Sequence, residues 1–258
     1  MKSFIGFSFI AAAICSVATL EIPPNGSSRI VNGPYAVNAP YNAYITYIDS
    51  AQTGFFGGGS LISDRHVLTA ALNIAGYVRW EVGLGSTVFG QLTKQISTQA
   101  IAHPSFNMAN RANDIGIIIL PSPVLFTELV QPIQLPLLGR TLPYENEEGM
   151  IVGFGFNTVN GQDRSDYLKV GYQRVIADSR CVGIYQITLP NHFCAEDALQ
   201  RSNVCNGDLG AAFVVPERGV KTLVGIASLI THNCDSVNPT GYTRVSPYRQ
   251  WIRDNAGV

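Results

Sequence analysis

Three short segments of this 258-residue chain contain its candidate catalytic positions, and two of these positions are leucines. Residues 113–117 contain Asp114, residues 205–212 contain Asp208 followed by Leu209, and residues 67–73 contain Leu72. A carboxylate can orient a base or pair with a cation, but leucine has no lone pair, no acidic proton and no nucleophilicity. At the positions of Leu72 and Leu209 these segments therefore supply neither a nucleophile nor a general base.

The segment around Leu209 resembles the nucleophile signature of chymotrypsin-like serine proteases, Cys-x-Gly-Asp-Ser-Gly-Gly-Pro. It reads Cys205-Asn206-Gly207-Asp208-Leu209-Gly210-Ala211-Ala212, with leucine in place of the serine. Residues 67–73 are similar to Val-Leu-Thr-Ala-Ala-His-Cys, with Leu72 in place of the histidine, and residues 113–117 place the family's aspartate at Asp114. The resemblance implies a triad reduced to Asp114, and loss of the serine or histidine costs on the order of 10⁶ in turnover.

Other motifs extend the resemblance over nearly all of the chain from Arg29 onward. They include an activation-type Arg29-Ile30-Val31-Asn32-Gly33, a Val152-Gly153-Phe154-Gly155 like Gly-Trp-Gly, and residues 239–245, similar to Pro-Gly-Val-Tyr-Thr-Arg-Val. The overall sequence is similar to those of invertebrate digestive proteases of the chymotrypsin or brachyurin type. A family bridge is absent at both ends, where Gly57 and Asn73 stand. The resemblance implies an all-β, chymotrypsin-like double six-stranded β-barrel with a C-terminal helix.

The N-terminal residues predict a secreted protein. Residues 1–18 combine a positive charge at Lys2, an apolar stretch and small residues at the expected cleavage site, as in a signal peptide. The apolar run falls short of the ~20 residues that a membrane anchor needs. Residues 19–29 are a short activation propeptide with a glycosylation sequon at Asn25. The protease-like domain follows at 30–258, with barrels expected over about 30–140 and 141–245.

The cysteines predict two disulfides in the mature chain. One of the five, Cys15, leaves with the signal peptide. The remaining four are Cys181, Cys194, Cys205 and Cys234, and an even number in a secreted chain favours bridges, although spacing alone allows three pairings. The resemblance selects Cys181–Cys194 and Cys205–Cys234. We expect no metal and no cofactor, because only His192 lies near any of these cysteines at ligand spacing.

Composition indicates a globular chain with almost no net charge, and therefore without a strong electrostatic field. Hydrophobic residues make up 46%, charged residues 14%, and the net charge is −1, which disfavours disorder, nucleic-acid binding and anionic membranes. A monomer is expected. Strands are predicted at 43–48, 77–84, 115–120, 150–156, 168–175, 211–215, 223–230 and 242–245. Short helices are predicted at 178–185 and 247–255.

The resemblance assigns two further remnants. Cleavage after Arg29 would free the amine of Ile30, which would pair with buried Asp208 and order the surrounding loops. This pair either switches a binding surface or merely holds an inherited fold. The oxyanion hole needs only the N–H groups of Gly207 and Leu209, so we expect it to persist.

The implied substrate pocket departs from the family. Its positions, counted from Leu209, are Asn203, Val204, Ser228, Leu229, Ile230 and Thr240. Ile230 and Thr240 put side chains where the family has small residues, which predicts a narrowed or filled pocket, unless loop shifts keep a cavity. Ser228 is expected to hydrogen-bond Asp114, which would then be a satisfied buried carboxylate rather than a repurposed site.

Three hypotheses of function follow. The first is a secreted, non-catalytic protease homologue that binds an extracellular protein as cofactor, decoy or competitor: a protease, a protease inhibitor, or an immune or digestive component. The second is residual or rewired serine-type endopeptidase activity; none of His66, His103, His192 and His232 pairs with a serine in a recognisable motif, so we expect surface or satisfied histidines. The third is a carrier of a small apolar ligand between Leu72, Leu209 and Ile230.

Overall fold

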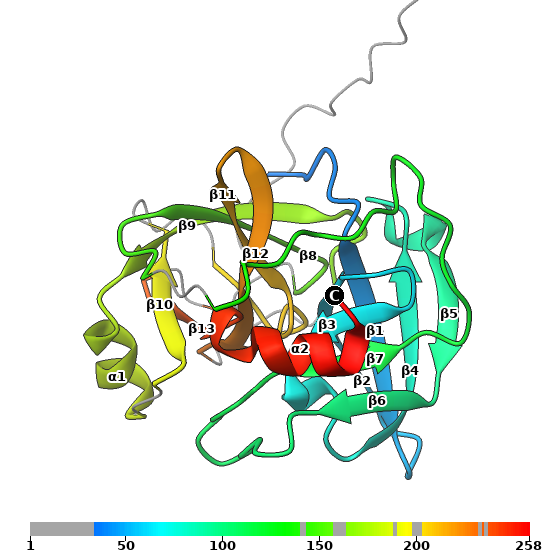
Figure 1. Ribbon diagram of the computed structural model, residues 1–258, viewed down its shortest axis with the longest axis horizontal. Coiled ribbons are helices and arrows are strands. Elements are labelled where there is room, and N and C mark those ends of the chain that lie inside the picture. The colour runs from blue at the N-terminus through cyan, green and yellow to red at the C-terminus, as the bar shows by residue number, and fades with distance from the viewer. Residues whose placement is uncertain are drawn as a thin grey trace, which may run out of the picture.

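The computed structural model describes residues 34–139, 143–156, 164–187, 190–197, 203–231, 234 and 237–258. The predicted signal peptide, the propeptide, Asn25, Arg29, Ile30 and His232 lie outside the described residues. Two β-sheets, formed by consecutive halves of the chain, make up the fold (Figure 1).

The first sheet has seven strands in the order β5-β4-β1-β2-β3-β7-β6. The strands are β1 (Asn42–Asp49), β2 (Gly54–Leu61), β3 (His66–Thr69), β4 (Tyr77–Leu84), β5 (Thr93–Ser97), β6 (Gln99–Ala102) and β7 (Gly116–Ile119). Its two edge strands, β5 and β6, are separated in sequence by Thr98 alone. The sheet must therefore curl until its edges meet, which gives it the shape of a barrel.

This arrangement corrects the expected strand count for the first barrel from six to seven. Strands β5 and β6 are separated at Thr98, where the hydroxyl of the preceding residue, Ser97, turns inward and donates to the carbonyl of Ile119 at 2.6 Å. The Ser97 oxygen also accepts the N–H of Gln99 at 3.0 Å, which closes a local turn.

The second sheet is a closed barrel of six strands in the order β10-β13-β12-β11-β8-β9, as expected. The strands are β8 (Glu148–Gly153), β9 (Lys169–Ile176), β10 (His192–Glu196), β11 (Ala212–Glu217), β12 (Val220–Leu229) and β13 (Thr240–Arg244). Each strand pairs antiparallel with its neighbours. Closure removes the exposed strand edges that would otherwise template aggregation.

Two short helices, both predicted, flank the barrels. Helix α1 (Ser179–Tyr185) lies beside β10, and α2 (Arg249–Ala256) follows the 3₁₀ turn η3 (Ser246–Tyr248) (Figure 1). Although α2 follows the last strand of the second barrel, Tyr248 donates to Asn113 Oδ1 at 2.9 Å in the first half of the chain. The C-terminal segment therefore ties the two halves together next to Asp114. None of the helices in the described ranges is long and apolar enough to cross a membrane.

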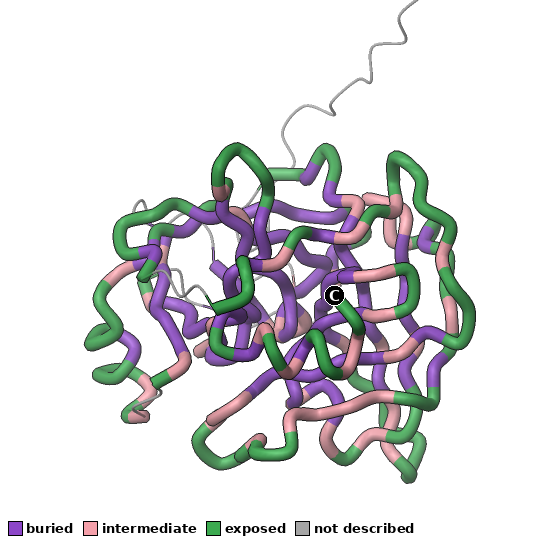
Figure 2. The backbone as a smooth tube through the Cα atoms, viewed as in Figure 1, coloured by how far each residue is buried: buried purple, intermediate pink, exposed green. Residues whose placement is uncertain are grey.

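Buried residues are concentrated in the strands of both sheets and at the seam between them (Figure 2). One apolar cluster fills the first sheet and another fills the closed barrel. The largest cluster takes members from both halves, including Leu68, Ile117, Phe154 and Ile252. Leu72 packs against this shared cluster, so the segments of interest lie at the junction of the barrels.

Candidate functional site

Asp114 lies at the centre of the junction and is completely buried. It is carried by the residues that lead into β7. Its Oδ2 accepts the hydroxyl proton of Ser228 at 2.6 Å, and its Oδ1 accepts the main-chain N–H of Leu72 at 2.8 Å. Burial raises the pKa of this carboxyl above its ordinary value, and the bonds from Ser228 and Leu72 oppose that rise. The predicted bond from Ser228 is present, so Asp114 is a satisfied buried carboxylate.

Leu72 sits in the 3₁₀ turn η1 (Ala71–Asn73), directly after β3. Its side chain is half-buried and contacts the shared apolar cluster. The imidazole that the resemblance would place here is replaced by a group that cannot accept the proton of a nucleophile. Only the main-chain N–H of this residue reaches Asp114.

Leu209 occupies a tight turn that leads into β11. Its carbonyl accepts the N–H of Gly58 at 2.8 Å and the side-chain amide of Asn73, also at 2.8 Å. Both donors belong to the first half of the chain, so the Leu209 turn is fixed to the opposite half of the molecule. The Leu209 side chain itself is half-buried.

The N–H groups of Gly207 and Leu209 are oriented by the carbonyls that precede them. The carbonyl of Asn206 accepts the N–H of Phe156, and the carbonyl of Asp208 accepts the N–H of Ala211, both at 2.9 Å. Because every described peptide bond is trans, each following N–H points away from the hydrogen bond that its carbonyl accepts. Neither N–H has an acceptor among the residues that the structure describes. The survival of these two N–H groups as an oxyanion hole stays a prediction.

Asp208 points into the closed barrel and is 1% exposed. Its carboxylate accepts the N–H of Gly155 at 2.8 Å and the N–H of Cys205 at 3.2 Å. A Cβ atom at Gly153 or Gly155 would overlap this carboxylate, so the glycines make room for it. Burial raises the pKa of Asp208 to about 6, against these two N–H groups. Both donors are neutral, which leaves the charge of Asp208 uncompensated by any cation in the described part of the chain.

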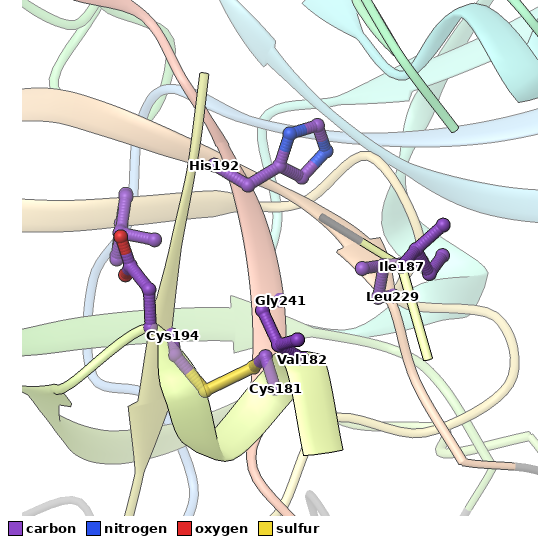
Figure 3. A pocket seen from close by; sticks show the side chains of 9 residues that line it. Cys181, Val182, Ile187, His192, Cys194, Leu229 and Gly241 are labelled. Carbon is purple, nitrogen blue, oxygen red and sulfur yellow. A yellow bond between two sulfur atoms is a disulfide. The ribbon is translucent and has the colours of Figure 1, made fainter. Parts of the chain in front are cut away.

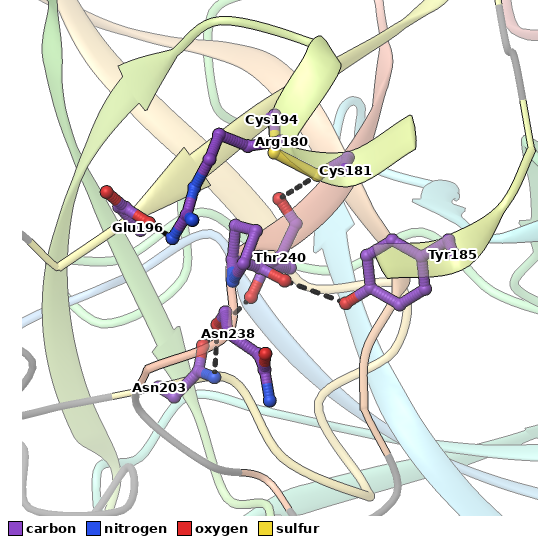
Figure 4. A network of polar contacts seen from close by, with 9 residues as sticks. Arg180, Cys181, Tyr185, Cys194, Glu196, Asn203, Asn238 and Thr240 are labelled. Carbon is purple, nitrogen blue, oxygen red and sulfur yellow. Dashed lines mark hydrogen bonds and ion pairs between the residues drawn. A yellow bond between two sulfur atoms is a disulfide. The ribbon is translucent and has the colours of Figure 1, made fainter. Parts of the chain in front are cut away.

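The predicted pocket positions are tied to one another (Figure 4). Asn203 is 4% exposed, and its Oδ1 accepts the Thr240 hydroxyl at 3.0 Å and the amide of Gln173 at 3.1 Å. Its own amide donates to the carbonyl of Asn238 at 2.9 Å. Val204 and Ser228 are buried, and Ile230 packs against the apolar core of the barrel. These pocket positions therefore take part in a buried polar network, and the filling of the pocket stays a prediction.

Gln173 is a member of this network that the sequence did not single out. Its Oε1 accepts the hydroxyl of Tyr242 at 2.6 Å, deep in the barrel. A signal was present, because β9 alternates exposed Tyr172 and Arg174 with buried Gln173 and Val175. A polar residue at an inward position of a strand demands buried partners.

Two histidines lie against serines, which the sequence did not lead us to expect. His66 Nδ1 is 2.7 Å from the hydroxyl of Ser63, but that oxygen also accepts the N–H of Arg65 and the N–H of His66 and belongs to a surface turn. His192 is buried, with Nε2 3.4 Å from Ser228 Oγ. The same Nε2 lies 3.1 Å from the hydroxyl of Thr243, whereas Nδ1 has no partner among the described residues.

Both predicted disulfides are present. Cys181 is bonded to Cys194 and joins α1 to β10, and Cys205 is bonded to Cys234 beside the Leu209 turn. No group of three or more candidate metal ligands lies among the residues searched, which are those that the structure describes.

Comparison with known proteins places this geometry in a family. The model of the trypsin family, described as "Trypsin", matches residues 30–252. The chain belongs to the trypsin family.

Individual relatives agree with that membership. The trypsin-family chain is 32% identical to a collagenase of Hypoderma lineatum over 262 residues, covering 96% of both proteins. It is 28% identical to a chymotrypsin of Phaedon cochleariae over 272 residues, covering 96% of this chain and 95% of the relative. A solved structure titled HL collagenase superposes with a TM-score of 0.79 at 31% identity, covering 89% of this chain and 99% of that one. The double-barrel fold is that of these trypsin-family proteins.

Proposed function

We propose that this trypsin-family chain is non-catalytic and acts by binding an extracellular protein. The observation that carries the proposal is the pair of leucines at the centre of an intact hydrogen-bonded frame. The Leu72 N–H reaches Asp114 at 2.8 Å, and the Leu209 carbonyl is held by Asn73 at 2.8 Å. The frame that would position a nucleophile and a base is therefore ordered, while both positions carry side chains without reactive groups.

The buried network at the pocket supports the same proposal. A hydrolase needs a recess for the substrate side chain next to its nucleophile. Here Asn203 and Thr240 bond each other at 3.0 Å, and both are at most 4% exposed. Opening a recess would strip buried polar groups of their partners, which costs about 1–3 kcal/mol for each unsatisfied group.

Asp208 supports a switched form of binding. A buried carboxylate without a cation is costly, and an ammonium group would relieve that cost. Cleavage after Arg29 would create such an ammonium on Ile30. The proposed result of cleavage is a Leu209 turn that is further stabilised by the Ile30–Asp208 pair, and hence a surface that a protease, a protease inhibitor or another extracellular component recognises.

The proposed location is outside the cell. Residues 1–18 act as a signal peptide in this proposal, and the two disulfides suit an oxidising compartment.

The test uses purified chain cleaved after Arg29, uncleaved chain and the uncleavable Arg29→Ala variant. We expect no inhibitor-sensitive turnover of peptide esters by any of them. Each form is then immobilised in the source's own extracellular fluid, and captured proteins are confirmed by titration with the purified partner. We expect saturable binding that is at least tenfold tighter for cleaved chain than for Arg29→Ala. Turnover above a mock preparation would overturn the non-catalytic half, and absence of a saturable partner for every form would overturn the binding half.

A further inference from the structure

A small cavity lies between α1 and strands β10, β12 and β13, and neither Leu72 nor Leu209 lines it (Figure 3). Its lining is mainly apolar and includes the Cys181–Cys194 disulfide. The two cysteines are bonded to each other, and no described lining residue is a serine, threonine or tyrosine. The cavity therefore offers neither a free thiol nor a hydroxyl group. A group that can react lies instead in the main chain beside Leu209.

The turn that precedes Leu209 contains the pair Asn206-Gly207. In an Asn-Gly pair, the main-chain nitrogen of the glycine can attack the side-chain amide carbon of the asparagine, because the two atoms close a five-membered ring. Glycine has no Cβ atom to shield its nitrogen, so the attack is least hindered when the second residue is glycine. Three further pairs, Asn25-Gly26, Asn32-Gly33 and Asn160-Gly161, lie outside the described residues.

The side-chain amide of Asn206 is open to this reaction. Asn206 is half-buried, and its amide makes no hydrogen bond to any described residue. The amide is not among the described polar groups that are buried without a partner, so solvent reaches it. Water, which the second step of the reaction consumes, therefore has access to this group.

The main-chain nitrogen of Gly207 is also uncommitted. Its N–H has no acceptor among the residues that the structure describes. The carbonyl of the same peptide group, on Asn206, accepts the N–H of Phe156 at 2.9 Å. A hydrogen bond to the carbonyl polarises the peptide group and makes its own N–H a better proton donor. Loss of the Gly207 proton therefore breaks no described hydrogen bond and is helped by one.

Two hydrogen bonds of the turn oppose ring closure. The peptide group between Asn206 and Gly207 must rotate for the nitrogen to reach the amide carbon. This rotation loosens the bond from Phe156, and it loosens the bond that joins the Asp208 N–H to the Cys205 carbonyl at 2.9 Å. The net contribution of one hydrogen bond corresponds to a roughly two- to thirteenfold slower reaction. Opening a single turn is a local event, so ring closure is slowed and not blocked.

We propose that Asn206 is a site of spontaneous deamidation. The Gly207 nitrogen gives its proton to hydroxide from the solvent and bonds to Cγ of Asn206. The Cγ–Nδ2 bond then breaks, and Nδ2 takes a proton from water and leaves as ammonia. Water next opens the resulting succinimide at one of its two carbonyl carbons. Cleavage of the new C–N bond leaves an aspartate at this position, and cleavage of the original peptide bond leaves an isoaspartate, whose main chain runs through Cβ.

Both products change the turn before Leu209. Each replaces a neutral amide by a carboxylate, two residues from Asp208 along the chain. The isoaspartate also adds one carbon to the main chain inside the turn that the bond from Asp208 to Cys205 closes, so that bond cannot keep its geometry. Weaker binding of the proposed partner follows. This consequence rests on the proposed function, whereas the deamidation itself does not.

Peptide mapping of the aged chain tests the proposal. Purified, folded chain is incubated in neutral buffer, and fragment masses locate each amide that has become a carboxylate. Chromatography then separates aspartate from isoaspartate fragments. We expect both products at position 206, because the succinimide opens on either side. Aspartate alone would indicate direct hydrolysis of the amide and would overturn the ring route.

Asn146 is the internal control. It is exposed, but the next residue, Glu147, carries a side chain, and its N–H donates to the Tyr144 carbonyl at 2.9 Å. We expect Asn206 to react at least threefold faster than Asn146, and a smaller ratio would contradict the site. Asn206→Gln cannot form the five-membered ring and should stay unmodified at this position over the same period. The readout is chemical and needs no partner, so it distinguishes failure of this site from failure of the proposed function.

Discussion

The side-chain amide of Asn73 donates a hydrogen bond to the main-chain carbonyl of Leu209 at 2.8 Å, across the junction of the two barrels. The same amide also donates to the hydroxyl of Thr69 at 3.0 Å. Asn73 stands where the resembling proteases have a bridge cysteine, and the other bridge position, Gly57, lies against it. The Asn73 side chain thus links the Leu72 turn to the Leu209 turn by a hydrogen bond. In the resembling proteases, the residue at this position would instead form a disulfide with the residue at the Gly57 position.

Removing this amide should loosen the Leu209 turn. We expect Asn73→Ala to lower the free energy of unfolding by about 1–3 kcal/mol, because two buried hydrogen bonds are lost and the Leu209 carbonyl keeps only Gly58. Urea unfolding followed by tryptophan fluorescence measures the change. A loss below about 0.5 kcal/mol, the lower end of what one hydrogen bond contributes, would mean that water replaces the amide.

Gly57 should not tolerate a side chain. A Cβ atom there would lie 2.7 Å from Asn73 Nδ2 and 2.8 Å from the Leu209 carbonyl oxygen. We expect Gly57→Ala to destabilise the chain by about 1–3 kcal/mol through overpacking. The matched control is Gly54→Ala in the same strand, whose Cβ would meet only Ile48, at 4.0 Å. Equal effects of the two substitutions would refute the close approach.

Asp208 should make the uncleaved chain more stable in mild acid. Its folded pKa of about 6 lies above the ordinary value of 3.8, so the folded state binds the proton more tightly than the unfolded state. The contribution is fully present below about pH 4 and is lost as pH rises through 6; the difference corresponds to about 3 kcal/mol.

His192 has the opposite effect on stability. Its pKa of about 4 in the folded chain lies below the ordinary 6.5, so the folded state loses stability as pH falls from 6.5 towards 4. Unfolding free energies of the uncleaved chain and of Asp208→Asn, measured from about pH 4.5 to about pH 7.5, separate the two. We expect Asp208→Asn to abolish the decrease in unfolding free energy that the unmodified chain shows as pH rises through 6. Cleavage after Arg29 should remove it as well, if Ile30 then pairs with Asp208. A pH profile that is unchanged in Asp208→Asn would exclude this carboxyl as the source.

Loss of the Ser228 hydroxyl should matter more at neutral pH than in acid. The hydroxyl favours ionised Asp114, whose pKa burial already raises. We expect Ser228→Ala to raise that pKa further, so its destabilisation, of about 1–3 kcal/mol at neutral pH, should shrink as pH falls and Asp114 takes up a proton. Chemical denaturation at about pH 7 and about pH 4.5 gives the comparison. A destabilisation that is independent of pH would indicate lost packing instead.

Restoring the two missing side chains should recover reactivity without recovering peptide cleavage. In Leu72→His with Leu209→Ser, Asp114 is in place to orient the new imidazole, and the N–H groups of Gly207 and Leu209 have no acceptor among the described residues. We expect the double variant, cleaved after Arg29, to be labelled by a small phosphonylating reagent, with either single variant as the unlabelled control.

The Asn203–Thr240 network should still keep that double variant from cleaving peptides with large side chains at the scissile position. Peptide amide hydrolysis within tenfold of a typical family enzyme would show that the pocket opens readily.

Local sequence patterns determined much of this protein. The strand at Tyr77–Leu84, both helices, the disulfide partners and the Ser228–Asp114 bond were all predictable. Each of these predictions used either residues that are close in sequence or motifs that occur in the same order along the chain as in the trypsin family. The two leucines were equally plain, because a missing functional group is a property of the residue alone.

Only the tertiary structure decided how distant residues share buried space. The break at Thr98, the engagement of Asn203 by Gln173 and the bond from Asn73 to Leu209 depend on contacts between segments 22 to 136 residues apart. The orphan nitrogen of His192 likewise depends on which strands surround it. Sequence periodicity shows that a polar residue faces inward, but its partner is set by barrel closure, which brings unrelated strands into register.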